Sequence, residues 1–376
     1  MWLAALCVLL VACETLSVAG PSNSSALPEP VATTPRSAQA PVAPPPRMVA
    51  IDIGPGFYNS CPVLEGGRVY CWGRNPFGGD ELLSVERRGA YLESLSSVSR
   101  IEVGKDRGCA LETGGVLRCW TPIRPRPRPT FADAGRIIDF AVGSQHVCAV
   151  TEGGSVRCDG DGAWSFSDKR WEQLAGLAQI APRDYGACAR MRDGTVSCWG
   201  DGRRGQLGTD SNVGFAHPRT VPGIADATFI AGHFQARQTC VLRRSGKVSC
   251  WGSHGAAPRL TLLANGVVDL PLLPDIAEIA VGPWEICALQ RSGQVACWGQ
   301  SLASARGAAN AAVYDAPRVI AELTDVAQVA QGALHACALR RNGAIACWGM
   351  NTFGQLGDGT TDDRSSPVTV TELPRP

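Results

Sequence analysis

Cysteine offers the most evident chemistry in this chain, because it can form disulfides, bind metal ions or act as a nucleophile. The chain holds 16 cysteines, and 14 of them fall into seven pairs with nine residues between the two members. The pairs are Cys61 with Cys71, Cys109 with Cys119, Cys148 with Cys158, Cys188 with Cys198, Cys240 with Cys250, Cys287 with Cys297, and Cys337 with Cys347. Spacing that recurs in this way predicts a repeated structural unit in which each pair has the same role.

A glycine stands six residues after the first cysteine of every pair, as Gly343 does after Cys337. We interpret the three residues ending at this glycine as a hairpin loop, a type I turn followed by a left-handed residue, where glycine is favoured. The paired cysteines then face each other across two strands, about 4.5 Å apart at Cα, which suits a disulfide. The spacing therefore predicts seven disulfide-linked hairpins. The alternatives are free buried thiols and metal binding, although isolated pairs lack the C-x2-C doublets of structural zinc sites.

Other candidate motifs lack the context that their chemistry needs. Residues 200–205 match the G-x-G-x-x-G pattern of dinucleotide sites, but no apolar helical segment follows them, so we expect a loop between strands. Residues 159–162 and 358–363 offer carboxylates without the spacing of a calcium loop, and we expect solvated turns. The five histidines are scattered. We predict no catalytic residues, no cofactor and no metal site.

The segments around each hairpin predict the rest of the fold. A short apolar segment precedes each hairpin, and a turn-rich loop with another strand-like piece follows it, so each repeat supplies four strands. Residues on both faces of the hairpin strands are apolar, as Ala338 and Leu339 illustrate. Such sheets must be covered on both sides. We therefore predict an all-β protein, a seven-bladed β-propeller of four-stranded antiparallel blades.

The stretch around the last cysteine pair resembles the repeat of the regulator of chromosome condensation family, whose members are seven-bladed propellers. The residues that match are Gly332, His335, Cys337, Ala338, Leu339, Gly343, Cys347, Trp348, Gly349, Asn351, Gly354, Gln355, Leu356 and Gly357. The resemblance covers about residues 48–376. It departs from the family pattern at Asp159, which stands where tryptophan is expected, and after Trp120, where Arg124, Arg126 and Arg128 form a basic run that we expect to be a solvated loop.

The founding members of that family exchange guanine nucleotide on a small nuclear GTPase. We do not expect this activity here, because the N-terminus carries an export signal. Residues 1–13 form an apolar run that resembles a bacterial signal peptide with a lipobox, so Cys13 is a candidate for lipidation; later cleavage, after Ala19, is the alternative. Residues 14–47 are rich in Pro, Ala and Ser and predict a disordered linker, and residues 48–376 form the propeller. We expect an exported protein of the bacterial cell envelope, lipid-anchored or secreted.

The charges point to no particular partner, since 35 basic residues balance 34 acidic ones. We expect no nucleic acid as a partner, contact with the membrane only through the lipid anchor, and a monomer. The loops just before the first cysteine of each pair should gather at one end of the ring, which we call the pre-cysteine rim. Its varied side chains suit contact with a protein. The candidate partner-binding residues are Phe57, Tyr58, Arg107, His146, Tyr185, Arg237, Trp284, Glu285 and His335.

The sequence thus favours a protein-binding module that is not an enzyme. Secreted bacterial members of the family include a type that inhibits β-lactamases through one end of the propeller, so enzyme inhibition is one version of this hypothesis. The alternatives are a propeller that binds envelope carbohydrate, and with less support an enzyme or a guanine nucleotide exchange factor. An enzyme would need a central pocket with converging carboxylates or a histidine–carboxylate pair.

Overall fold

The computed structural model describes residues 50–374, apart from residues 57, 75–88, 122–123, 145, 161–173, 184, 210–212, 237, 253–265, 272, 301–312 and 372. The predicted signal peptide, the lipidation site Cys13 and the linker lie outside the described residues. The part of the chain that the structure describes consists of strands and connecting loops. Within it, no helix has the length and apolar character needed to cross a bilayer.

Seven antiparallel sheets follow one another along the chain, and each is built from consecutive strands. The first three blades contain β1 (Ala50–Pro55), β2 (Asn59–Leu64), β3 (Tyr70–Gly73) and β4 (Ala90–Tyr91); β5 (Val98–Val103), β6 (Gly108–Glu112), β7 (Leu117–Thr121) and β8 (Arg124–Thr130); and β9 (Ile137–Val142), β10 (His146–Thr151) and β11 (Val156–Gly160).

The other four blades contain β12 (Leu177–Arg183), β13 (Gly186–Met191), β14 (Val196–Gly200) and β15 (Phe215–Thr220); β16 (Ala227–Gly232), β17 (Gln238–Arg243), β18 (Val248–Gly252) and β19 (Val268–Asp269); β20 (Ile276–Val281), β21 (Glu285–Gln290), β22 (Val295–Gln300) and β23 (Val313–Val319); and β24 (Val326–Gln331), β25 (His335–Arg340), β26 (Ile345–Gly349) and β27 (Arg364–Thr369). The third blade has three described strands, and residues 161–173, which follow them, are not described.

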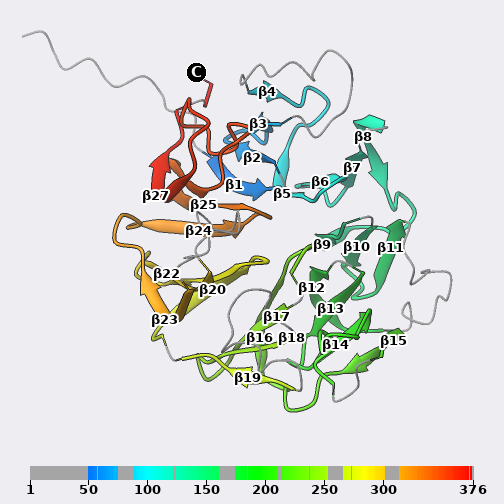
Figure 1. The fold of residues 1–376 in the computed structure, drawn as a ribbon. Helices are drawn as coiled ribbons and strands as arrows, with labels where there is room; N and C mark the ends of the chain where they lie inside the picture. Colours follow the sequence, from blue (N-terminus) through cyan, green and yellow to red (C-terminus); the bar gives the residue numbers. More distant parts are fainter. Residues whose placement is uncertain are drawn as a thin grey trace, which may run out of the picture. The chain divides into compact units, whose positions relative to one another are not determined.

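The blades form a ring, as Figure 1 shows by the red C-terminal strands beside the blue β1. The first strand of each blade neighbours the first strand of the next, and β24 neighbours β1. The predicted all-β, seven-bladed propeller is therefore confirmed. Among the described strands, no strand from one end of the chain enters the blade at the other end. Side chains join these two blades instead, as the Trp72 indole N–H donates to the Gln355 carbonyl at 3.0 Å.

The hairpins have the predicted geometry. In the last blade Cys337 lies opposite Cys347, and the Gly343 N–H donates to the Arg340 carbonyl at 2.9 Å with a φ of 77° at Gly343. The other described hairpins repeat this register, with each first cysteine facing its partner across the two strands.

The predicted cysteine pairing is confirmed in all seven blades, with Cα–Cα distances between 4.0 and 4.2 Å. Free thiols and metal-bound thiolates, the two alternatives, are excluded for these residues. The disulfides join Cys61 to Cys71, Cys109 to Cys119, Cys148 to Cys158, Cys188 to Cys198, Cys240 to Cys250, Cys287 to Cys297, and Cys337 to Cys347. The spacing and the turn glycine were therefore sufficient to predict both the hairpins and their pairing.

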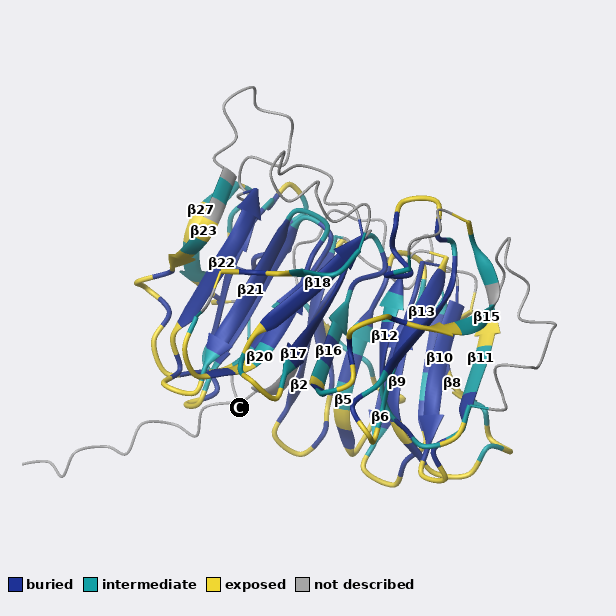
Figure 2. Cartoon of the chain, turned by 90° about the horizontal axis from the view of Figure 1, so that it is seen from below, coloured by how far each residue is buried: buried dark blue, intermediate teal, exposed yellow. Residues whose placement is uncertain are grey.

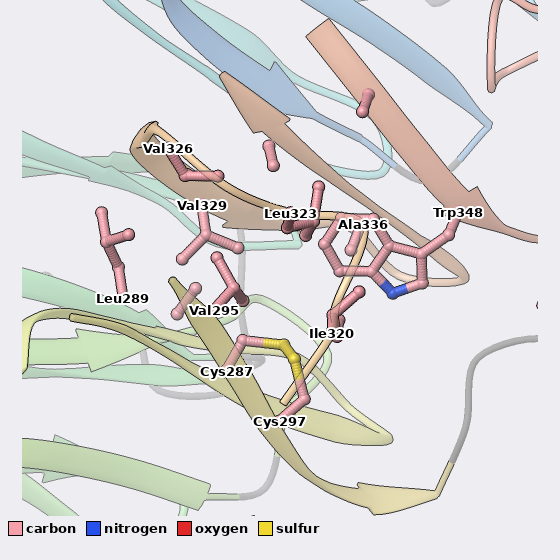
Figure 3. Close-up of a cluster of buried hydrophobic side chains, with 13 residues drawn as sticks. Cys287, Leu289, Val295, Cys297, Ile320, Leu323, Val326, Val329, Ala336 and Trp348 are labelled. Atoms are coloured by element: carbon pink, nitrogen blue, oxygen red, sulfur yellow. A yellow bond between two sulfur atoms is a disulfide. The ribbon is translucent and has the colours of Figure 1, made fainter. Parts of the chain in front are cut away.

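The hydrophobic core is divided into seven clusters, one between each two successive blades. The second and third strands of the blades are buried along most of their length, whereas the outer strands, such as β27, and the loops are more exposed (Figure 2). In the cluster between the sixth and seventh blades, Trp348 of one blade lies in the same cluster as the Cys287–Cys297 disulfide of the other (Figure 3). The same combination of disulfide and tryptophan recurs in five further clusters.

One local prediction is wrong. The basic run that we expected to be a loop forms β8, the outer strand of the second blade, where Arg128 pairs with Cys119. Proline is compatible with an outer strand when its nitrogen faces away from the sheet. The backbone N–H and C=O of Cys119 point toward β8, so the backbone N–H of its partner Arg128 points back toward β7. Because successive residues of a strand alternate in direction, the nitrogens of Pro127 and Pro129 point away from β7.

Candidate functional site

The pre-cysteine rim consists of the loops that join the first and second strands of the blades. These loops are residues 56–58, 104–107, 143–145, 184–185, 233–237, 282–284 and 332–334. Because the blades have the same strand order, the loops lie at the same end of the ring. Residues 57, 145, 184 and 237 are not described, so the predicted contacts Phe57 and Arg237 lie outside the described residues.

The residue three positions before the first cysteine is at least partly exposed in every blade where it is described. Tyr185 is 44% exposed, Asp106 is exposed, and Tyr58, Trp284 and Leu334 are half-buried. Trp284 also packs against the core cluster between the sixth and seventh blades. The carbonyls of Tyr58, Tyr185 and Trp284 accept N–H bonds of 2.8 to 3.0 Å from residues at or just beyond the end of the third strand of the same blade, which holds these positions in place. Three aromatic side chains therefore occupy equivalent, partly exposed positions in the first, fourth and sixth blades, which we call the outward positions.

In the third and seventh blades the next residue, two positions before the first cysteine, contacts the following blade instead. His335 Nε2 lies 2.7 Å from the Ser60 hydroxyl oxygen, and His146 Nε2 lies 3.1 Å from the Gly186 carbonyl. Both rings are buried. Burial lowers the pKa of His146 to about 4 and that of His335 to about 3, so both are neutral at physiological pH. The repeated histidine of the family thus connects neighbouring blades.

Other blades fill this inward position with different polar groups. The Gln238 amide donates to the Gly282 carbonyl at 3.1 Å, and the Arg107 guanidinium lies 3.4 Å from the Asp159 carboxylate of the next blade. Arg107, His146, Glu285 and His335 were all predicted to bind a partner. Their side chains instead contact the neighbouring blade, and we therefore exclude them from the proposed binding surface.

Glu285 lies in a small cavity between the sixth and seventh blades, with a volume of about 20 Å³. The Trp348 indole donates to its carboxyl group, while Oε2 has no hydrogen-bond partner among the described residues. Burial raises the pKa of Glu285 to about 8, although the Trp348 hydrogen bond and the charge of Arg318 act in the opposite direction. The sulfurs of Cys287 and Cys297 are close enough to share a metal ion with this carboxyl group, but they are joined in a disulfide. They are therefore not available as thiolate ligands.

The central channel has a volume of about 180 Å³ and is lined by the first strands of the blades. Its polar groups hold the blades together: Glu102 accepts the Val142 N–H at 2.9 Å, and Gln179 accepts the Ile230 N–H at 3.0 Å. Burial raises the pKa of Glu102 to about 7 despite its ion pair with Arg100. The Glu102 carboxyl group therefore has a structural role, since it joins the second blade to the third.

The loop of the fifth blade covers the channel at the pre-cysteine rim. His233 and Phe234 are 5% and 3% exposed, and both line the channel. The Ser144 hydroxyl of the third blade donates to the Phe234 carbonyl at 3.2 Å, so this loop reaches past the fourth blade. The rim therefore presents a covered surface rather than an open central pocket.

Sequence reasoning missed a part of the surface that comes from the loops after the third strands, which lie at the same end. Phe353 packs edge-on against Tyr58 with 4.7 Å between ring centroids, and Arg74 lies over both rings. Arg203 lies beside Tyr185 and pairs with Asp201 at 2.9 Å. The strand order could have revealed these residues, since the third loop of an antiparallel blade returns to the end where the first loop lies.

The two remaining motifs have structural roles. Gly200 is the last residue of β14, and residues 201–205 lie in the loop between β14 and β15, as expected. The Asp358 carboxyl group, by contrast, is 7% exposed and not a solvated turn. Burial would raise the pKa of Asp358, but bonds from Thr360, Arg364 and Asn351 lower it overall. Protein groups therefore occupy the positions that a cation would need.

A family model described as the regulator of chromosome condensation (RCC1) repeat matches residues 50–78 and 326–355, and a second model of the same description matches residues 342–376. The matches fall on the first and last blades, which meet where the ring closes.

Several solved structures are similar to this chain. The ectodomain of the receptor kinase CR4 from Physcomitrella patens has 18% identity and a TM-score of 0.52, and 80% of this chain aligns with 74% of that chain. The CRINKLY WD40 ectodomain of the Arabidopsis thaliana receptor kinase ACR4 has 18% identity and a TM-score of 0.51, over 80% of this chain and 95% of that chain. Yeast RCC1 (Prp20), in a structure with Kap60 bound, has 18% identity and a TM-score of 0.50, over 85% and 74%. At this identity the similarity shows the fold alone.

Proposed function

Because the chain is an RCC1-repeat protein, we propose that it acts as a protein-binding module through the outward positions of the pre-cysteine rim. The observation that carries this proposal is the recurrence of Tyr58, Tyr185 and Trp284 at equivalent outward positions, of which Tyr185 is the most exposed. A repeated frame needs polar or apolar residues that pack at the inward position. It does not need aromatic residues at the outward one, so a partner is the better explanation.

The chemistry of these positions suits protein recognition. Tyrosine, tryptophan and arginine dominate the residues that contribute most to protein–protein affinity. Here Arg74 and Phe353 surround Tyr58, and Arg203 lies beside Tyr185. Because backbone hydrogen bonds fix both loops, little conformational entropy is lost on binding. Yeast RCC1, which shares the fold, binds the protein Kap60 through a part of its chain that the similarity does not identify.

The compartment follows from the cysteines. Seven disulfides indicate an oxidising environment. We propose that residues 1–13 direct export, that Cys13 is acylated, and that residues 14–47 hold the propeller away from the membrane. Mass spectrometry of the mature N-terminus tests this, and an unmodified N-terminus after Ala19 would support secretion instead. Enzyme inhibition is the specific version of binding that we favour for such a tethered propeller.

Affinity capture from an extract of the producing cells tests the binding surface. The bait is the oxidised protein, compared with a Tyr185→Ala, Trp284→Ala variant and with a Val116→Ala, Val319→Ala control whose residues are exposed outside this rim. Loss of two anchor residues should lower recovery of the partner at least tenfold, while the control retains it. Equal recovery of every captured protein by all three baits would reject the proposed surface.

A further inference from the structure

The outer strand of the second blade is unlike the other outer strands in its sequence. β8 alternates arginine with proline, and Arg124, Arg126 and Arg128 are all exposed. Within the part of the chain that the structure describes, none of these three guanidinium groups has an ion-pair partner. Three uncompensated positive charges thus lie on one strand of a chain whose net charge is +1.

The strand register places two of these charges on one face. Arg124 lies opposite Thr121 and Arg128 lies opposite Cys119, and these two residues of β7 share a face because they are two positions apart. That face looks toward the third blade, since Cys119 belongs to the cluster between the second and third blades. Arg126 lies between the two arginines, where the register of β8 shifts against β7. The three guanidinium groups therefore follow one another along a single exposed strand.

The groups beside this face are more positive than those at its counterpart in the sixth blade. In the sixth blade the residue equivalent to Arg128 is Arg318, and it lines a cavity that holds the Glu285 carboxyl group and the Trp348 indole. In the second blade, Arg107 stands where Glu285 would be, and Asp159 stands where Trp348 would be. Among the described carboxylates, Asp159 alone forms an ion pair beside this face, and its partner is Arg107.

The prolines limit the kind of ligand. An added peptide strand would need N–H donors along the outer edge of β8, and Pro127 and Pro129 have none to offer. Recognition must therefore use the arginine side chains, which bind phosphate and sulfate groups through parallel N–H donors. A single-stranded nucleic acid would also need aromatic side chains for base stacking, and β8 has no aromatic residue.

We propose that β8 binds a linear polysaccharide that carries several sulfate or phosphate esters along its chain. The esters bind to Arg124 and Arg128 on the face that looks toward the third blade, and to Arg126 between them. This surface is separate from the outward positions of the pre-cysteine rim, and its occupation does not depend on a protein partner.

The test uses heparin as the sulfated probe, with the full chain in its oxidised form. Retention on immobilised heparin is measured over a salt series for the wild type, for an Arg124→Gln, Arg126→Gln, Arg128→Gln variant, and for an Arg192→Gln, Arg244→Gln, Arg291→Gln control. The control removes the same charge from exposed arginines at the hairpin end of the ring. We expect the β8 variant to lose at least tenfold in affinity, with a salt slope smaller by about two to three. The control should stay within twofold of the wild type.

Two further arms make the result decisive. Replacing the same three arginines with lysine keeps the charge and removes the paired donors, so affinity should fall between those of the wild type and the glutamine variant. A single-stranded oligonucleotide of equal charge should displace the protein from heparin less effectively than dextran sulfate. Equal losses for the β8 variant and the control, or displacement by the oligonucleotide at lower concentration than by dextran sulfate, would overturn the proposal.

Discussion

The interface between the sixth and seventh blades and the interface between the second and third blades are built on the same frame and filled differently. In the former, Trp348 is 3% exposed and packs in one cluster with a disulfide. In the latter, the equivalent residue is Asp159, whose side chain is 62% exposed and pairs with Arg107. Both interfaces nevertheless belong to one closed ring. The ring therefore does not need a tryptophan at every interface.

A difference at a second position explains in part why the ring tolerates an interface without a tryptophan. Phe140 lies in the first strand of the third blade, where the neighbouring blades have Ile101 and Ile180 at the same register. Phe140 is fully buried in the cluster that lacks the tryptophan. The larger ring restores some of the apolar contact that Asp159 gives up. Interfaces in such a ring thus vary one at a time, because each cluster involves two blades.

The largest expected difference between the two interfaces is in the unfolding free energy that is lost when the equivalent tryptophan or Asp159 side chain is removed. Trp348→Ala removes a buried indole from the interface of the sixth and seventh blades and should lower the free energy of unfolding by about 3–5 kcal/mol. Asp159→Ala removes a weak, exposed ion pair and should cost less than about 1 kcal/mol. Chemical denaturation of the oxidised proteins measures both. Similar costs for the two variants would show that the interfaces do not differ as proposed.

The sequence predicted the parts of the fold that depend on local spacing. The nine-residue separation and Gly343-type turns specify the hairpins, and the repeat resemblance specifies seven blades. The side-chain direction at the rim could not be predicted in the same way. His335 and Leu334 are adjacent, yet one faces the next blade and the other faces outward. That difference depends on β25 beginning at His335, two residues before the cysteine, where we had expected a loop.

The strand β8 was missed for a related reason. Its three prolines argue against a central strand, and only its position at the outside of the blade makes them acceptable. That position depends on contacts with β7 that local sequence patterns do not report. The burial of Asp358 was missed likewise, since its partners Asn351 and Arg364 lie seven and six residues away along a folded loop.

A second prediction uses the groups at the inward position, where Glu285 of the sixth blade corresponds to Arg107 of the second. The pKa of Glu285 is raised from 4.5 to about 8. Below pH 4.5 the carboxyl group is protonated in the folded and unfolded states alike. As the pH rises from 4.5 to 8, only the unfolded state loses the proton, so this group lowers stability progressively, and above 8 the loss is complete.

Glu285→Gln should therefore become more stable than the wild type as the pH rises through this window. The gain should grow by at most about 1.4 kcal/mol per pH unit, and it should be absent at pH 4. Thermal unfolding at a series of pH values measures it. Glu322→Gln is the matched control, because Glu322 lines the same cavity but is exposed. A parallel pH response of wild type and Glu285→Gln would contradict the assigned burial effect.

The smallest expected effect concerns the order in which the disulfides are reduced. Cys158 of the third blade is partly exposed, and Cys119 of the second is 8% exposed, whereas every other disulfide cysteine is 6% exposed or less. Thiol–disulfide exchange requires access to a sulfur atom. Limited reduction of the folded protein should therefore open Cys148–Cys158 first and Cys109–Cys119 next, both in the blades that flank the interface without a tryptophan. Alkylation and peptide mass spectrometry identify the opened pairs. If Cys287–Cys297, whose cysteines are 0% and 4% exposed, opened at the same rate, then exposure of the sulfur atoms would not set the order of reduction.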